Sequence, residues 1–283
     1  MKKKLVNIST VTFFIIGLSL LLYPMAANQW NTYRQSKLIS NYDSQIKKME
    51  SSGKVDMKGE WEKAAAYNEA LLPSILPDSF AVAEAAKEED KTYTSSLNLT
   101  GDGMMGKVVI PKINVNLPIF HYTTEEVLEQ GVGHLEGSSL PVGGENTHSV
   151  LSAHRGLPSA TLFTDLDKLE KGDHFLLYIL DDVLCYEVDQ IKVVEPDETQ
   201  DLAVIQGQDL VTLFTCTPYG VNTHRLLVRG HRVPYEAEIL ENEQILLDGK
   251  SMHTNYMLWV VVGLAVTGVL IFLMYRFEKK RRR

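Results

Sequence analysis

Residues 209–216, Asp-Leu-Val-Thr-Leu-Phe-Thr-Cys, give the clearest indication of the fold, because they predict a buried β-strand with a thiol at its end. Turn-forming residues over 217–224 interrupt the pattern and predict a loop. A second strand, Arg-Leu-Leu-Val-Arg, then begins at Arg225. If the two strands pair antiparallel, the Cα atoms of Cys216 and Arg225 lie roughly 5 Å apart. A guanidinium beside a thiol favours the thiolate, which is the nucleophilic form of cysteine.

A cysteine that performs acyl transfer needs a proton carrier, and a histidine distant in sequence is the usual one. Residues 150–154, Val-Leu-Ser-Ala-His, predict another short strand that ends on its reactive residue, His154. The chain has eight histidines. His148 and His224 are therefore competing candidates, the second because it adjoins Arg225.

From residue 105 onward the chain alternates short apolar stretches with turn residues, which predicts a mainly β domain built as a closed barrel or a sandwich. Two helical patches are expected near 124–130 and 161–168. The expected strands are 106–110, 113–119, 147–153, 174–180, 183–194, 209–216 and 225–231.

Several separated blocks carry a family resemblance over roughly residues 60–235. They are Met105-Gly106, Ile110-Pro111-Lys112-Ile113, Leu117-Pro118-Ile119, the Gly-rich stretch 133–144, Leu151-Ser152-Ala153-His154-Arg155-Gly156-Leu157, Thr212-Leu213-Phe214-Thr215-Cys216 and 217–225. These blocks resemble the sortases, and most closely class C, the pilus-assembling sortases. The resemblance implies a sortase-type closed β-barrel with short helices. It also implies that His154 is the acid/base, Cys216 the nucleophile and Arg225 the transition-state stabiliser.

The resemblance further implies a cysteine transpeptidase that cleaves a Leu-Pro-x-Thr-Gly-like sorting motif after its Thr. The thioacyl intermediate would pass to a lysine of the next pilin subunit, and the reaction would need no cofactor and no metal. The expected partners are pilin or surface proteins that bear such a motif. Three other functions stay open: a wall-anchoring sortase with a peptidoglycan-precursor amine as acceptor, a non-catalytic membrane-anchored scaffold, and a hydrolytic cysteine protease.

A lid-like segment is expected at 73–104. Class C enzymes carry an Asp and an aromatic residue here, usually separated by a proline, and this chain has Asp78 and Phe80 with Ser79 between them. The resemblance implies that Phe80 covers the thiol and that Asp78 pairs with Arg225. The alternative to a lid is an ordinary surface turn with Phe80 buried.

The two ends of the chain indicate membrane attachment. Residues 1–27 begin Met-Lys-Lys-Lys and continue as an apolar run, which favours an uncleaved signal anchor over a cleaved signal peptide. Residues 256–275 contain no charge and are long enough to cross a ~30 Å hydrocarbon core. A basic tail follows at 276–283. Since basic clusters stay in the cytoplasm, we expect a cell-membrane protein with both termini cytoplasmic and 28–255 outside.

The expected exterior part comprises a helical extension at 28–72, divided near 51–53, the barrel at 105–235 and a linker at 236–255. The net charge of the whole chain is −8, and removal of the two basic clusters leaves this part more acidic still. No electrostatic feature therefore favours nucleic-acid binding. The second cysteine, Cys185, lies in a strand pattern and is predicted to be a buried thiol without a disulfide.

Overall fold

The computed structural model describes residues 2–53, 55–71, 76–78, 80, 90–236, 263, 267 and 268. Within the chain, one compact unit, Tyr23–Glu243, contains the whole barrel. The remaining unit includes the apolar beginning of the chain. Several expected features fall wholly or mostly outside the described residues. They are residues 73–75, 79 and 81–89 of the lid-like segment, the linker 236–255, the span 256–275 and the tail 276–283.

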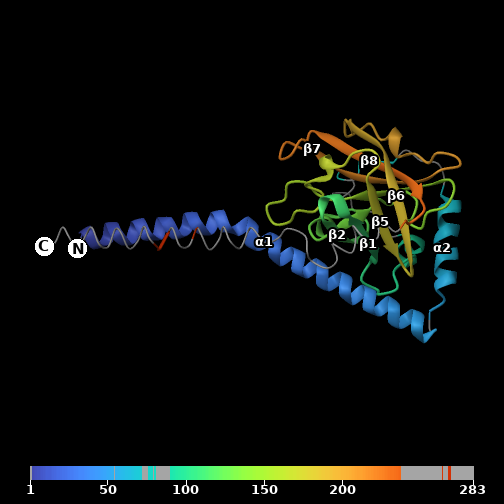
Figure 1. Cartoon of the computed structure of the whole chain (residues 1–283), viewed down its shortest axis with the longest axis horizontal. Coiled ribbons are helices and arrows are strands. Elements are labelled where there is room, and N and C mark those ends of the chain that lie inside the picture. Colours follow the sequence, from blue (N-terminus) through green and yellow to red (C-terminus); the bar gives the residue numbers. More distant parts are fainter. Residues whose placement is uncertain are drawn as a thin grey trace. The chain divides into compact units, whose positions relative to one another are not determined.

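Eight strands form a closed barrel in the order β1-β2-β3-β4-β7-β8-β6-β5, with β5 pairing back to β1 (Figure 1). Neighbouring strands are antiparallel, except that β2–β3 and β4–β7 are parallel. The expected mainly β fold with a closed barrel is thereby confirmed. The strands are β1 (Met104–Ile110), β2 (Val115–His121), β3 (Val132–His134), β4 (Thr147–Ser152), β5 (His174–Ile179), β6 (Asp182–Val194), β7 (Asp209–Thr217) and β8 (His224–Val233).

Strand β3 is absent from the set expected from sequence, because three residues centred on a glycine carry no alternating pattern. Gly133 is required there: a Cβ at this position would lie 2.3 Å from the backbone oxygen of Tyr122. The expected strand at 113–119 also begins later than predicted. Pro111–Ile113 forms a short 3-10 helix, η1, and Asn114 then takes a left-handed φ of 56° before β2 begins.

Helices flank the barrel and interrupt its loops. They are α1 (Lys2–Ser52), α2 (Met57–Ala70), α4 (Lys91–Ser95) and α5 (Glu125–Leu128), with the 3-10 helices η2 (Leu166–Lys168) and η3 (Gln200–Leu202). The helical patch expected at 124–130 corresponds to α5. Only the end of the patch expected at 161–168 is helical, as η2, and turns occupy the rest.

Helix α1 is continuous from Lys2 to Ser52 and includes Pro24, so the helix does not stop where the sequence changes from apolar to polar. It ends at Gly53, whose φ is +60°, and this matches the division expected near 51–53. Part of α1 is long and apolar enough to cross a membrane by length and composition, a test that a signal sequence also passes.

The polar part of α1 packs on the barrel. Ile39, Tyr42 and Ile46, spaced at three and four residues, are buried in the main hydrophobic core. The Tyr42 hydroxyl donates to the backbone oxygen of Met105 at 2.9 Å. The extension therefore belongs to the folded domain.

The segment before β1 is also fixed to the barrel at its end. Tyr93 of α4 is fully buried, and its hydroxyl lies 2.8 Å from His134 Nδ1. His134 Nε2 donates to the backbone oxygen of Ser139 at 2.8 Å, and burial lowers the pKa of His134 to about 3. A neutral histidine therefore ties α4 to β3.

Candidate active site

The end of β7 brings the thiol and the arginine together. Cys216 is the partner of Arg225 in the antiparallel β7–β8 register, as the sequence predicts. Neither side chain is freely exposed: Cys216 is 8% exposed and Arg225 is 9% exposed. The loop 218–223 joins the two strands directly beyond this pair.

The parallel strand β4 brings His154 to the same level on the other side of β7. Thr215 Oγ1 donates to the backbone oxygen of Ala153 at 2.7 Å, so the β4–β7 register continues past the last residue of β4. One residue further along this register, His154 lies beside Cys216. Since neighbouring strands are about 4.8 Å apart, the three predicted residues share one end of the barrel wall.

Asp78 pairs with the guanidinium of Arg225. Arg225 Nε donates to Asp78 Oδ1 at 2.8 Å and Nη2 donates to Oδ2 at 2.7 Å, which is a bidentate pair. Arg225 Nη1 donates to the backbone oxygens of Asn222 and His224. The arginine is therefore engaged on all three of its nitrogens in this state.

Phe80 lies against both neighbours of the thiol. Its ring centroid is 5.4 Å from that of His154, and the guanidinium carbon of Arg225 is 5.4 Å from the Phe80 centroid. A stacked contact with Phe214, at 5.9 Å, joins Phe80 to a small hydrophobic cluster beside the site. The structure thus brings Asp78 and Phe80 to the residues expected from sequence.

The thiol is less acidic than the sequence suggests. Burial raises the pKa of Cys216 above its ordinary value. Arg225 lowers this pKa, but Asp78 raises it and so opposes the arginine. The expectation that Arg225 favours the thiolate omitted the desolvation of the thiol and the carboxylate that neutralises the guanidinium.

His154 has one ring nitrogen directed at a carboxylate. Its Nε2 lies 3.3 Å from Oε1 of Glu125, at the start of α5. This nitrogen is buried, and among the described residues it makes no hydrogen bond. The backbone oxygen of His154 accepts a hydrogen bond from the amide of Phe163 at 3.1 Å, which fixes the chain just after β4.

Arg155 connects the chain segments next to His154 and Cys216. Its side chain is 8% exposed and forms an ion pair with Asp167. Nη1 donates to Thr217 Oγ1 at 2.9 Å, and Nε donates to the backbone oxygen of Thr164 at 3.1 Å. The guanidinium therefore connects the chain after His154 to the residue after Cys216. This role was not predicted from the sequence, although Arg155 stands in the motif around the histidine.

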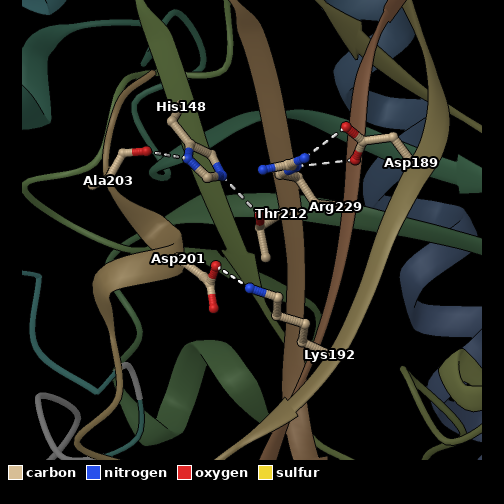
Figure 2. Close-up of polar contacts among 7 residues, drawn as sticks. All are labelled: His148, Asp189, Lys192, Asp201, Ala203, Thr212 and Arg229. Atoms are coloured by element: carbon tan, nitrogen blue, oxygen red, sulfur yellow. Dashed lines mark hydrogen bonds and ion pairs between the residues drawn. The ribbon is translucent and has the colours of Figure 1, made fainter. Parts of the chain in front are cut away.

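The competing histidine His148 belongs to a second group of polar residues on the barrel strands (Figure 2). We call this group the wall cluster; it consists of His148, Thr212, Arg229 and Asp189. His148 Nδ1 donates to the backbone oxygen of Ala203 at 2.8 Å, and Nε2 lies 2.7 Å from Thr212 Oγ1. Burial lowers the pKa of His148 below its ordinary value. With both ring nitrogens engaged, this histidine has a structural role.

His224, the second competing histidine, also lies near a glutamate but is more exposed than His154, and Cys185, the second thiol, is the register partner of Val233 and not of an arginine. His224 Nε2 is 3.2 Å from Glu195 Oε1, and its side chain is 41% exposed. Cys185 is a buried free cysteine, as predicted, and burial raises the pKa of its thiol to about 11. Cys216 is also free, so no disulfide joins the two cysteines.

Comparison with known proteins agrees with this geometry. A sortase-domain family model matches residues 108–233. Sortase D of Bacillus subtilis (strain 168) is 33% identical over 168 residues, which are 58% of this chain and 81% of the relative. Sortase C of Streptococcus pneumoniae is 44% identical, with a TM-score of 0.64, over 71% of this chain and 98% of that one. For sortase C1 of Streptococcus agalactiae the identity is 47% and the TM-score 0.62, over 71% and 100% of the two chains.

The match to the family model spans the strands that carry the cysteine and the arginine. The similar solved structures are class C enzymes. The chain therefore belongs to the sortase family, as a class C cysteine transpeptidase.

Proposed function

We propose that this chain is a membrane-anchored sortase that polymerises pilins. It cleaves a Leu-Pro-x-Thr-Gly-like sorting motif after the Thr and joins the new carboxyl end to a lysine of another pilin subunit. The observation that carries the proposal is the placement of Cys216 opposite Arg225 and beside His154 at one end of the barrel. A nucleophile, a proton carrier and a fixed positive charge at one level meet the needs of acyl transfer.

In the first half-reaction, the Cys216 thiol gives its proton to His154, and Cys216 Sγ attacks the carbonyl carbon of the Thr-Gly peptide bond. Arg225 stabilises the negative charge that develops on the carbonyl oxygen. The carbon–nitrogen bond then breaks, and His154 gives a proton to the departing amine because an unprotonated amide anion is too unstable to leave. The substrate remains attached to Cys216 as a thioester.

In the second half-reaction, the lysine ε-amine attacks the thioester carbon. His154 takes a proton from this amine, the carbon–sulfur bond breaks, and the proton passes to the sulfur, which regenerates the Cys216 thiol. The product is an amide between the sorting-motif Thr and the lysine side chain. No redox partner is required by this sequence of steps.

We infer that Asp78 and Phe80 form a lid that closes the resting enzyme. The bidentate pair with Asp78 withholds Arg225 from a substrate oxygen, and Phe80 contacts the two residues on either side of Cys216. Substrate must displace both contacts before the first half-reaction begins. The lid segment is 73–104, and the catalytic domain is 105–235.

Two observations favour pilin polymerisation over wall anchoring. The first is similarity to class C sortases, among which the structure of the Streptococcus pneumoniae enzyme has been related to pilin substrate specificity. The second is the contact of Asp78 with Arg225, which matches the lid expected of that class. The apolar part of α1 would anchor the enzyme in the membrane, with 28–255 on the extracellular face and both termini in the cytoplasm.

The test is mass spectrometry of products formed by the full chain in detergent micelles. The substrates are a pilin fragment that ends in the sorting motif and a second fragment that supplies lysines, with a peptidoglycan-precursor pentaglycine or diamino-acid amine as competitor. The proposal predicts a Thr–lysine isopeptide cross-link. Exclusive transfer to the precursor amine would support wall anchoring, and exclusive addition of water would indicate a protease.

A further inference from the structure

The carboxylate of Glu125 lies next to His154, the proposed proton carrier of the site. The two proposed half-reactions do not involve Glu125. Its Oε1 is 3.3 Å from His154 Nε2. The nitrogen is buried and, within the described part of the chain, makes no hydrogen bond. The Nε2 atom of His154 is therefore close to the negative charge of Glu125 but makes no hydrogen bond with it.

The position of Glu125 is set by the fold. Thr124 precedes α5, and Leu128 of the same helix is fully buried. The amide of Gly131 donates to the backbone oxygen of Val127 at 3.0 Å, which leads the chain straight into β3. The backbone at Glu125 is therefore anchored, while the side chain itself is 60% exposed.

The other charged groups near His154 have their own partners. Arg155, the next residue, pairs with Asp167 and donates to Thr217. Arg225 on β8 and Asp78 on the lid are paired with each other. On β7 the group beside His154 is the Cys216 thiol, and Phe80 supplies an uncharged ring. This leaves Glu125 as the carboxylate directed at His154 among the described residues.

We propose that Glu125 is a positioning residue for His154. Its carboxylate accepts the Nε2 proton, which fixes the tautomer and leaves Nδ1 to exchange protons with the thiol and the departing amine. The same negative charge stabilises the imidazolium that forms when Cys216 gives up its proton. The inference rests on the proposed role of His154 and adds to it the residue that orients the ring.

The distance in this closed state is consistent with that role. Catalytic hydrogen bonds are often long in the absence of substrate and shorten in the reacting complex. A neutral ring at 3.3 Å gains little from the carboxylate, whereas a charged ring gains an ion pair. Since Glu125 is largely exposed, water screens the pair, and its effect on rate is modest.

The test compares Glu125→Ala, Glu125→Gln and Glu126→Ala in the full chain in detergent micelles. All are made in an Asp78→Ala background, so that lid opening does not limit the rate. The glutamine keeps an oxygen that can accept the Nε2 proton but removes the charge. Glu126 is the matched control, because its carboxylate is on the same helix and accepts a hydrogen bond from Thr124, the residue that precedes α5.

Three quantities are measured for each variant: kcat and KM for cleavage of a sorting-motif peptide, and the ¹⁵N chemical shifts of the His154 ring. Glu125→Ala is expected to lower kcat about two- to fivefold, the scale of an exposed ion pair, with KM unchanged. It also reduces the share of the Nε2-protonated tautomer. Glu125→Gln keeps that tautomer and still loses kcat, and Glu126→Ala resembles the background.

Unchanged kcat and tautomer in Glu125→Ala would overturn the inference, as would an equal loss of kcat in Glu126→Ala. His154→Ala in the same background separates this outcome from failure of the proposed function. If His154→Ala keeps its activity, the proposed function is wrong. If His154 is essential while the Glu125 variants behave as the background, only the positioning role fails.

Discussion

The candidate active site and the wall cluster contain similar residues on the same strands, but their polar groups are paired in different ways. Each set has a histidine at or just beyond β4, a residue on β7, an arginine on β8 and a paired aspartate. The site contains His154, Cys216, Arg225 and Asp78, and the wall cluster contains His148, Thr212, Arg229 and Asp189. In both sets the β7 residue is the register partner of the arginine.

The two sets differ in where the polar partners originate. Asp189 is on β6, so the bidentate pair with Arg229 is made within the barrel itself (Figure 2). Asp78 precedes the barrel in sequence and is not part of a strand. Arg229 is thus satisfied within the barrel, whereas Arg225 is satisfied by a residue that substrate displaces in the proposed mechanism. We therefore propose that a similar set of side chains is structural in the wall cluster and catalytic in the site.

The largest contrast is expected between the two histidines. His154→Ala should lower kcat by ~10²–10⁴-fold, because it removes the proton carrier. His148→Ala should change kcat little and instead lower the free energy of unfolding by about 1–3 kcal/mol, since it leaves buried hydrogen-bonding groups unpaired. Peptide cleavage and thermal unfolding measured on both variants check the pair. An equal loss of kcat in a folded His148→Ala variant would remove the distinction.

A smaller contrast is expected between the two arginines. Arg225→Ala should lower kcat by ~10²–10³-fold, the effect of removing an oxyanion donor. Arg229→Ala leaves Asp189 without its partner and should appear mainly as reduced thermal stability. The comparison needs kcat at saturating peptide for both variants. If Arg229→Ala loses as much kcat as Arg225→Ala while it stays folded, the assignment of Arg225 is wrong.

The smallest contrast concerns the two aspartates and is seen in thiol reactivity. In a Cys185→Ala background, Asp78→Ala should increase the rate of alkylation of Cys216 by iodoacetamide, because the lid opens more easily. Its loss also lets Arg225 lower the pKa of Cys216 unopposed, so the alkylation profile should move to lower pH. Asp189→Ala should leave the rate and the profile unchanged.

Phe80→Ala removes the aromatic cover of the thiol and keeps the Asp78 carboxylate. It should increase the alkylation rate by exposing the thiol, and because burial raises the pKa of Cys216, the profile should also move to lower pH while Asp78 still opposes Arg225. Identical rates in the parent protein, Asp78→Ala and Phe80→Ala would mean that these residues form only a surface turn.

Most of the barrel could be predicted from the sequence, because most of its strands are apolar stretches bounded by turn residues. The strands that hold Cys216 and Arg225 contain runs of apolar and β-branched residues and are separated by turn residues, so their approximate limits and their pairing were predictable. Strand β3 was not, because three residues around Gly133 have no periodicity and pair only through contacts distant in sequence. Helix α1 continues past residue 27 because its polar part places Ile39, Tyr42 and Ile46 at helical spacing, where they pack into the core.

Within the site, residues in the motifs could be predicted and residues outside them could not. His154 lies just beyond the end of β4, Cys216 is next to the last residue of β7, and Arg225 is next to the first residue of β8. Positions this close to the strand ends can be recognised along the sequence. Glu125 lies on a four-residue helix, and nothing in an acidic pair indicates which histidine it faces. The raised pKa of Cys216 depends on burial and on Asp78, which act only once the chain is folded.

The most decisive measurement is mass spectrometry of the full chain quenched with acid during turnover of a sorting-motif peptide. Acid preserves a thioester, and proteolysis then locates it. The proposed mechanism predicts an acyl group that ends in the motif Thr, attached to Cys216, and no adduct in Cys216→Ala. An adduct on Cys185, or continued turnover by Cys216→Ala, would contradict it.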